Sequence, residues 1–307
     1  MSEEYMFVVK DLSKGTTKRG SPFYSLMLSN ETEGTVSAKV WEIREEIKRG
    51  SVYHFYGKWQ TYQGNRQFVV ENYDLIKDQI SPQKLSDMAG VKSVSVSVFD
   101  EMIKILEEID GTNEAHVFTK NVLMKHKDKI ISAPAAKSIH HNFPGGLMLH
   151  LYEVGMISMM IGGFFSNTPI VKDSYGKIDN GLLLSGGLLH DIGKIETYTH
   201  NALPEYTDVG LLEGHIPIGY ALIKEELEEQ KMDEMFKSKL LHIMLSHHER
   251  QEWGSPVAPM FIEAQLVHYA DQISSKVATF DSIFTDDTHD GNWTDFNRNL
   301  NRSLFKE

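Results

Sequence analysis

The sequence predicts a multi-domain protein in which an N-terminal all-β barrel is followed by an all-α bundle. Two observations carry this prediction. Segments rich in β-branched and aromatic residues fill residues 5–78, and apolar residues recur at helical spacing from residue 82 onward. The chain has 307 residues, roughly two domains by length, and its 41% hydrophobic and 24% charged residues are typical of globular proteins. We expect the barrel over residues 1–78, a helical linker region over 79–137 and the bundle over 138–307.

The barrel is predicted from four strand-like segments, which turn-like sequences separate: residues 23–28, 35–41, 51–59 and 67–70. Between the second and the third segment, residues 42–50 have amphipathic spacing and end in glycine, which predicts a short helix. A helix inserted among about five strands indicates an OB-fold.

Aromatic and basic residues alternate through this barrel segment. Proteins bind single-stranded nucleic acid by stacking bases on aromatic rings beside cationic groups. The alternation does not say which rings lie inside the barrel, but we expect Phe23, Trp41 and Tyr62 to be exposed and to contact bases. Residues 1–78 carry 11 basic and 11 acidic side chains, so the barrel is expected to guide a strand rather than to hold it tightly. A barrel that only mediates assembly is the alternative.

The second half of the chain has helical spacing almost throughout. Pro82 stands at an expected helix start, and residues 98–109 form a further amphipathic helix. Breaks are expected at residues 144–146, 180–181 and 254–256. The longest apolar run, residues 154–165, is shorter than the roughly 20 residues of a membrane span and predicts a buried helix.

Composition excludes several classes of chemistry. The chain has no cysteine, so disulfides, thiolate zinc sites and cysteine nucleophiles are ruled out. The net charge of −12 falls entirely outside residues 1–78 and by itself disfavours binding to nucleic acid. The N-terminus is acidic and has no apolar export signal, so we expect a cytoplasmic protein without a membrane segment.

Histidines are concentrated in the helical half: ten of the 14 lie between residues 140 and 268. Several of them, and two aspartates, interrupt otherwise apolar helical faces: His150, His190, Asp191, His215, His247, His248 and Asp271. Burying an unpaired imidazole or carboxylate is costly, so their repeated placement predicts that they converge on shared cations. Separate core histidines, each with its own hydrogen bonds, are the alternative.

The order of these residues resembles the ligand set of the HD phosphohydrolase superfamily. Over nearly the whole chain the sequence is similar to the YhaM-type 3′-to-5′ exoribonucleases, which place an OB-fold before an HD domain. The segments that carry the resemblance are residues 145–150 (GGLMLH), 190–196 (HDIGKIE), 214–216 (GHI), 245–249 (LSHHE), 254–256 (GSP) and the tail 293–305. The chain departs from the family at Leu149, where many members have glutamate.

The resemblance implies two divalent metal ions. One would be held by His150, His190 and Asp271, and the other by His215, His247 and His248, with Asp191 bridging them. An all-nitrogen and oxygen ligand set suits Mn²⁺, Fe²⁺, Co²⁺, Ni²⁺ or Zn²⁺, and manganese is the metal that the family implies. Such a pair activates water for attack on a phosphodiester.

Three further residues are candidates for binding the substrate. Lys194 lies one helical turn after His190 and is expected to steady a phosphate oxygen during catalysis, the alternative being a helix cap. His140 and His141 precede the glycine pair and either contact phosphate or base, or belong to an ordinary exposed loop.

The sequence therefore predicts a metal-dependent 3′-to-5′ exonuclease that releases nucleoside 5′-monophosphates from single-stranded RNA, with DNA as a second substrate. One alternative keeps the metal site but gives it a nucleotide or a cyclic dinucleotide. The other is a nucleic-acid-binding adaptor with a degenerate site. The resemblance is compatible with a homo-oligomer, which no residue of the sequence specifies.

Overall fold

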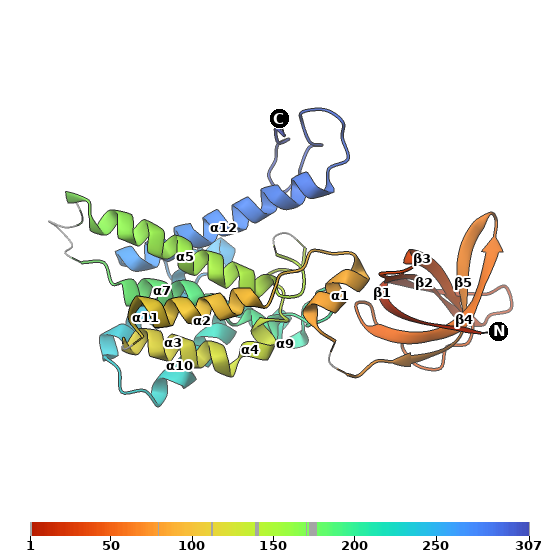
Figure 1. The fold of residues 1–307 in the computed structure, drawn as a ribbon, viewed down its shortest axis with the longest axis horizontal. Coiled ribbons are helices and arrows are strands. Elements are labelled where there is room, and N and C mark those ends of the chain that lie inside the picture. The colour runs from red at the N-terminus through yellow and green to blue at the C-terminus, as the bar shows by residue number, and fades with distance from the viewer. Residues whose placement is uncertain are drawn as a thin grey trace.

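Five strands, paired antiparallel except for one parallel pair, close into a barrel at the N-terminal end of the molecule (Figure 1). The computed structural model describes residues 2–78, 80–111, 113–138, 141–169, 171 and 177–306. The strands are β1 (Glu3–Thr16), β2 (Pro22–Asn30), β3 (Gly34–Val40), β4 (Val52–Tyr62) and β5 (Asn65–Leu75). Their order around the barrel, β1-β2-β3-β5-β4, with the parallel β3–β5 pair closing it, is that of an OB-fold. The predicted fold class is thus confirmed.

The first strand, β1, holds the barrel together because it pairs with β2 through one part of its length and with β4 through the other. A register shift between Val9 and Asp11 bends it between the two pairings, as β-bulges do at barrel corners. This strand was not among the segments that composition identified, because its second half is polar and exposed.

The helix predicted for residues 42–50 is wrong: these residues form an irregular loop across one end of the barrel. Ile43 packs against the barrel core and Ile47 is buried in it, which explains the amphipathic spacing. Tyrosine hydroxyls bond the loop's backbone amides: that of Tyr73 accepts from residues 44 and 45, and that of Tyr53 from residue 48. Bonds to side chains from the barrel thus take the place of helical ones, and a nine-residue helix is too short to compete.

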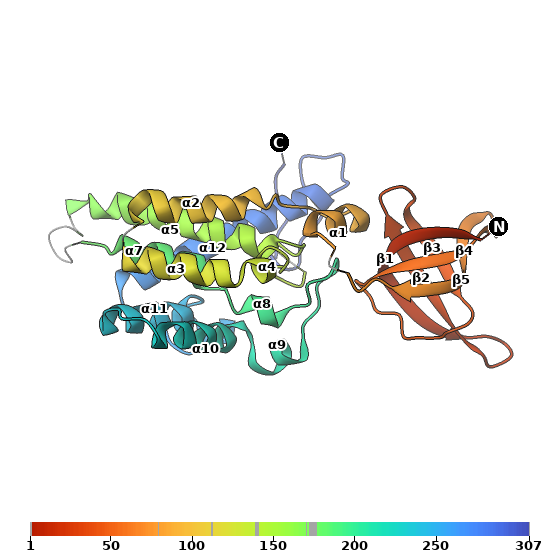
Figure 2. The same cartoon turned by 60° about the horizontal axis from the view of Figure 1, so that its bottom comes forward.

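Most of the remaining described residues are helical, and Figure 2 shows the helices after α1 lying side by side at the other end of the molecule. The helices are α1 (Pro82–Ala89), α2 (Ser97–Asp110), α3 (Glu114–Lys125), α4 (Lys127–Ile130), α5 (Gly146–Ser166), α7 (Asn180–Leu189), α8 (Lys194–Thr197), α9 (Asp208–Glu213), α10 (His215–Glu228), α11 (Glu234–Ser246) and α12 (Ile262–Asp286), with a 3-10 helix η1 (Gln251–Trp253). The helix start predicted at Pro82 is confirmed, and α5 begins at Gly146, the last residue of the break predicted at 144–146. Asn180 begins α7, capped by Asp179.

Helix α7 lies at the centre of the bundle, and all its residues from Gly181 to Leu189 are buried. It packs against α5 at a point where both helices have glycine. A Cβ added at Gly187 would lie 2.7 Å from the Cα of Gly155, so the two backbones are in direct contact. This contact brings the C-terminal end of α7 next to the N-terminal half of α5, where the functional histidines lie.

Helix α5 contains the apolar run predicted to be buried, and only its first part meets that expectation. Within the run of residues 154–165, Val154, Gly155 and Ser158 are buried, whereas Met160 and Phe164 near the other end are 72% and 68% exposed. By length and composition α5 is also apolar enough to cross a membrane. Its packing against α2, α7 and α12 accounts for that composition, since core helices of globular domains pass the same test.

The region predicted as a helical linker divides between the two parts of the molecule. Helix α1 packs on the barrel, where Leu85 and Met88 join a small apolar cluster with Val8 and Val52. Helices α2 and α3 instead contribute Phe99, Phe118 and their neighbours to the core of the bundle.

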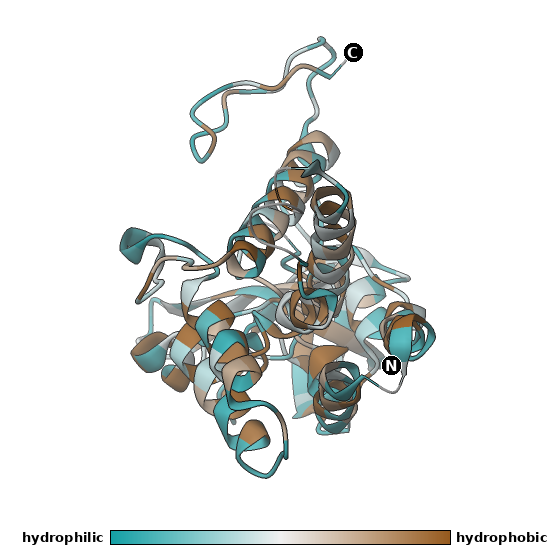
Figure 3. Ribbon diagram, turned by 90° about the vertical axis from the view of Figure 1, so that its left-hand side faces the viewer, coloured by the Kyte–Doolittle hydropathy of each residue, from teal (hydrophilic) through white to brown (hydrophobic). Residues whose placement is uncertain are grey.

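Helix α12 is the longest helix, and its C-terminal end carries the rest of the chain away from the bundle, as Figures 1 and 3 show. Residues 287–306 form an arm in which Trp293 pairs with Phe305 and Asn297 with Arg302. In the hydropathy view most helices carry both apolar and polar segments (Figure 3).

Candidate metal centre

Seven polar side chains from five helices and the turns after them converge in the middle of the bundle. They are His150 in the second turn of α5, His190 and Asp191 at the end of α7, His215 at the start of α10, His247 and His248 at the end of α11, and Asp271 within α12. Five of them are buried, and His215 and His248 are partly exposed. The sequence analysis singled out all seven, and the structure brings them to one place.

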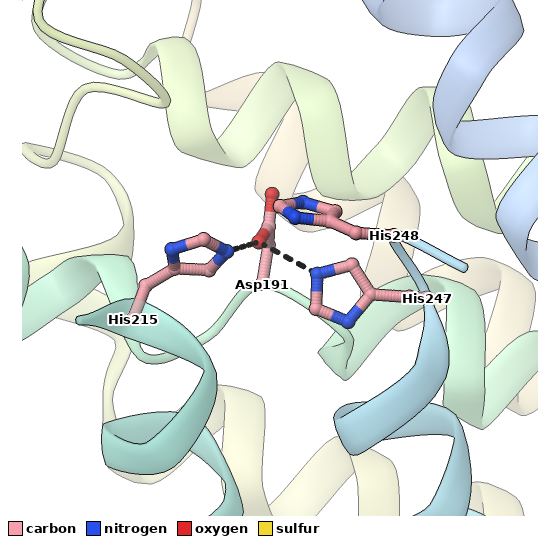
Figure 4. A group of neighbouring side chains, drawn as sticks. All are labelled: Asp191, His215, His247 and His248. Carbon is pink, nitrogen blue, oxygen red and sulfur yellow. Dashed lines mark ion pairs between the residues drawn. The ribbon is translucent and has the colours of Figure 1, made fainter. Parts of the chain in front are cut away.

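Asp191 lies between two groups of ligands and faces both. Its Oδ2 atom is 3.2 Å from Nε2 of His150 and 3.4 Å from Nε2 of His190. Its Oδ1 atom is 3.3 Å from Nε2 of His215 and 3.5 Å from Nε2 of His247 (Figure 4). The donor atoms of His150, His190, Asp191 and Asp271 lie within 4.8 Å of one another, and so do those of Asp191, His215, His247 and His248. One carboxylate thus offers a separate oxygen to each group.

The close approach of α10 to the turn after α7 depends on Gly193. A Cβ at this position would lie 2.1 Å from the carbonyl oxygen of His215 and 2.5 Å from the amide nitrogen of Gly219. Any side chain here would push the start of α10 outward, and with it the imidazole of His215.

Hydrogen bonds at the outer nitrogens orient the imidazoles. Nδ1 of His190, His247 and His248 lies 2.6 to 2.9 Å from the backbone carbonyl oxygens of Gly187, Met244 and Trp253. A carbonyl oxygen only accepts, so each Nδ1 carries the proton and each Nε2 presents its lone pair to the centre. This is the arrangement that metal-ligating histidines usually have.

Two of the imidazole lone pairs at the centre have no donor. Nε2 of His215 and of His247 is buried, and within the described part of the chain no group donates a hydrogen bond to either atom. Leaving such an acceptor unpaired costs about 1–3 kcal/mol. A divalent cation satisfies both atoms, and the set of imidazole nitrogens and carboxylate oxygens suits one. The residues therefore fit a metal centre.

The charge states also suit metal binding. Burial lowers the pKa of His190, and it lowers the pKa of His215 well below the usual value, so both are neutral near pH 7. Burial and the neighbouring His247 lower the pKa of His248 to about 4. Burial alone would raise the pKa of Asp191, but the Lys194 ammonium and the His190 imidazole outweigh it and hold that pKa well below its usual range. Ionised carboxylates and neutral imidazoles are the ligating forms.

Lys194 lies against Asp191, with Nζ 2.5 Å from Oδ2. It is the first residue of α8 and is 6% exposed, so its charge is buried beside the centre. The contact supplies one positive charge to the carboxylate and directs the ammonium toward the cavity described below.

A chain of hydrogen bonds behind His150 was not predicted. The Ser274 hydroxyl donates to Oε2 of Glu153 at 2.6 Å, and its oxygen lies 2.9 Å from Nδ1 of His150, from which it accepts. Glu153 is also 3.4 Å from Nε2 of His141. Glu153 lies three residues after His150 on the same face of α5, and that spacing is the signal that could have identified it.

The two histidines before the glycine pair are only partly described. His140 lies outside the described residues. His141 is buried, so the alternative of an exposed loop is wrong for it. It packs beside His150, with ring centroids 5.6 Å apart, and lines a cavity of about 660 Å³ together with Leu149 and Glu153.

The three barrel rings expected to be exposed differ in their surroundings. Trp41 and Tyr62 are 48% and 60% exposed. Phe23 is only partly exposed because its ring packs against Trp41, at 5.0 Å between centroids, and over the backbone of Gly15. The ammonium of Lys39 lies 4.8 Å from the Phe23 ring, so rings and a cation lie together here as the sequence analysis expects for a strand-binding face.

A cavity of about 630 Å³ opens onto the metal-ligand cluster. Three of the seven residues, His215, His248 and Asp271, line it together with Lys194. Its other walls include three aromatic residues that the sequence analysis did not consider: Tyr198, Tyr206 and Trp253. The volume falls within the range of about 300–1,000 Å³ that is usual for ligand pockets.

Comparison with known proteins finds a match to the HD domain family over residues 148–276, the segment that contains all seven candidate ligands. Over 286 residues the chain is 30% identical to the 3′-5′ exoribonuclease YhaM of Listeria innocua, covering 91% of this chain and 87% of that protein. It is 28% identical over 283 residues to the 3′-5′ exoribonuclease YhaM of Bacillus subtilis, covering 91% and 86% of the two chains.

Among solved structures, the second OB-fold domain of replication protein A from Methanococcus maripaludis matches 26% of this chain and 89% of that domain. The sequence identity is 18% and the TM-score is 0.22.

Proposed function

The chain belongs to the family of the 3′-5′ exoribonuclease YhaM, and from this we propose that it removes nucleoside 5′-monophosphates one at a time from the 3′ end of single-stranded RNA. The HD domain match and the seven converging ligands support a metal-dependent hydrolase. Attack of water on the last phosphate forms a P–O bond and breaks the bond to the 3′ oxygen of the preceding ribose. The shortened chain keeps a 3′-hydroxyl, ready for the next cycle.

The observation that carries the proposal is the position of Asp191. Its two oxygens face two separate groups of imidazoles, as a carboxylate shared between two cations requires. His150, His190 and Asp271 would hold one divalent ion, and His215, His247 and His248 the other. When bound, such a pair supplies Lewis acidity to the phosphate and lowers the pKa of the attacking water. Manganese is the metal that we propose, because the ligands are nitrogen and oxygen only and the family resemblance favours it.

The residues of the chain itself have distinct tasks around this pair. The outer hydrogen bonds of the histidines hold the rings in place, so little reorganisation is needed when substrate binds. The Lys194 ammonium, buried at the cavity wall, is placed to neutralise charge that develops on a non-bridging phosphate oxygen. The barrel, with Trp41 and Tyr62 exposed, would guide the single strand toward the cavity.

The test uses RNA labelled at the 5′ end that carries either a free 3′-hydroxyl or a 3′-phosphate, incubated with the full chain and Mn²⁺ or Mg²⁺. We expect stepwise shortening of the free ends and survival of the blocked ones. Internal cleavage, or shortening that persists after chelation and dialysis, would contradict the proposal. Single-stranded DNA in the same assay measures the preference between the two polymers. Hydrolysis of a nucleotide or cyclic dinucleotide with RNA left intact would assign the site to a small substrate instead.

Asp191→Asn is the matched variant for the metal centre, because it keeps the shape and removes the charge. Two-metal activation contributes several kcal/mol, so we expect activity to fall on the order of 1,000-fold and the bound metal measured by elemental analysis to decrease. Asp290→Asn, at an exposed position in the C-terminal arm, is the control and should leave both unchanged.

A further inference from the structure

A hairpin of residues 198–206, here called the bridging hairpin, connects the barrel to the cavity of the metal centre. Its ends pair through Tyr198 and Tyr206, and the amide of Thr199 donates to the carbonyl of Glu205. Its tip contacts the barrel: the amide of Ala202 donates to the carbonyl of Gly50, and Ala202 is buried against Val8 and Val52. One end of this element therefore touches the barrel and the other end lines the cavity.

The base of the bridging hairpin presents an aromatic ring to the cavity. Tyr206 packs against Tyr198, with ring centroids 4.9 Å apart, yet 41% of its surface stays exposed. The ammonium of Lys137, another residue of the cavity wall, lies 5.9 Å from the Tyr206 ring. An exposed ring beside a cation is the arrangement on which proteins stack the bases of a single strand.

A second ring lines the same cavity from another part of the chain. Trp253 is 48% exposed, and the guanidinium of Arg250 lies 4.9 Å from its ring. The carbonyl of Trp253 accepts the hydrogen bond from Nδ1 of His248 at 2.6 Å. The ring is therefore attached to the same turn that orients a candidate metal ligand, which fixes its place relative to His248.

We infer that Tyr206 and Trp253 are the residues that stack the bases at the 3′ end of the substrate, next to the phosphate that is cleaved. The inference rests on the proposed exonuclease function and adds to it the subsite that holds the terminal bases. The metal centre by itself recognises only phosphate. Stacking is tolerant of sequence, since every base has an aromatic face, so it suits an enzyme that must accept each new end in turn.

The test compares leucine and phenylalanine variants at both positions on ordinary RNA and on RNA whose 3′-terminal residues are abasic. Stacking contributes about 1–3 kcal/mol per base, so we expect Trp253→Leu and Tyr206→Leu each to raise KM for ordinary RNA by about 5- to 150-fold. For the wild type, KM should rise by a similar factor when abasic RNA replaces ordinary RNA. For the leucine variants, the same replacement should raise KM only slightly. Trp253→Phe and Tyr206→Phe should keep most of the affinity for ordinary RNA.

Bis(p-nitrophenyl) phosphate has no nucleobase, but its two rings can also stack, so kcat at saturating ester is the value that reports on the metal centre. We expect the leucine variants to lose far less in kcat on this ester than they lose in kcat/KM on ordinary RNA, and Phe164→Leu, an exposed ring at the far end of α5, to match the wild type in every assay. An unchanged KM for ordinary RNA, or an equal loss on RNA and on the nitrophenyl ester, would overturn the inference. If the wild type hydrolyses the ester but does not shorten RNA, it is the proposed function that fails.

Discussion

At the scale of single residues, Asp191 and the imidazoles around it define the centre, and the hydrogen bonds behind His150, His190, His247 and His248 keep these rings in place. The link from His150 through Ser274 to Glu153 is the only one of these outer bonds among the described ligands that runs through side chains alone. It is therefore the one that a single substitution can remove without disturbing the backbone.

Ser274→Ala should weaken metal binding about 10- to 100-fold, because His150 loses the partner that fixes its tautomer and ring orientation. Titration of the metal-free full chain with Mn²⁺ measures the change in Kd. Ser282→Ala, two turns further along α12, is the control. An unchanged Kd in Ser274→Ala would show that the hydroxyl does not orient the ligand.

The metal-free protein should lose stability as the pH is lowered from about 6.5 toward 4. Burial lowers the pKa of His190 and of His215, and lowers that of His248 to about 4. In this pH range the unfolded chain binds protons that the folded chain refuses, so the free energy of unfolding falls with falling pH. His150 works in the opposite direction: burial would lower its pKa, but Asp191 and Asp271 outweigh burial and raise it.

Denaturant unfolding in chelator at several pH values measures this dependence. His248→Gln should make the slope between pH 6.5 and 4 shallower, and His289→Gln, an exposed histidine of the C-terminal arm, should not. A stability that rises as the pH falls through this range would show that the imidazoles are not buried as neutral groups.

At the scale of secondary structure elements, close backbone contacts decide where the ligands lie. Gly155 and Gly187 let α5 and α7 touch, and this contact sets the separation of His150 and His190, whose Nε2 atoms are 3.3 Å apart. The two helices have no room for even a methyl group between them.

Gly187→Ala should destabilise the fold by about 1–3 kcal/mol, because its Cβ would meet the backbone of α5 at 2.7 Å. Gly163→Ala is the matched control: it lies on the same helix as Gly155, but its Cβ would have nothing within 4 Å. There we expect no loss and up to about 1 kcal/mol of gain from the better helix former. Denaturant unfolding of the two variants in chelator measures both free energies. An equal change in the two variants would contradict the prediction.

The order of elements could largely be predicted from the sequence, because strand composition, the proline at Pro82 and the apolar helical spacing are local signals. The loop over residues 42–50 could not, because tyrosine hydroxyls from distant strands satisfy its backbone. The candidate ligands stand out because each is polar in an apolar helix. Tyr206 and Trp253 do not, since a ring in a loop becomes informative only when the fold places it beside a cavity.

At the scale of the whole molecule, the bridging hairpin reaches the barrel at the small apolar cluster that α1 also joins, where Ala202 lies with Val8 and Val52. The ion pair between Arg49 and Glu205, at 2.9 Å, adds to this contact but is exposed. The buried Ala202 is therefore the better point at which to separate the two parts.

Ala202→Asp places an unpaired charge against Val8 and Val52 and should weaken the attachment of the barrel to the bundle. We expect kcat/KM for a long RNA to fall at least about tenfold, the equivalent of roughly 1.4 kcal/mol, and that for a dinucleotide to stay near the wild-type value. Glu205→Gln removes only the exposed ion pair and should change either rate by less than about fivefold. Equal losses on both substrates would mean that the barrel does not guide the strand.

The seven candidate metal ligands lie between residues 150 and 271, so no short fragment of this chain contains all seven. Each ion would cross-link three helices, and the two together would cross-link five, so the free energy of metal binding is added to that of folding. The stability of the protein therefore depends on the supply of the ion. In a cell that lacks the ion, we expect the protein to be degraded faster, in addition to losing its activity.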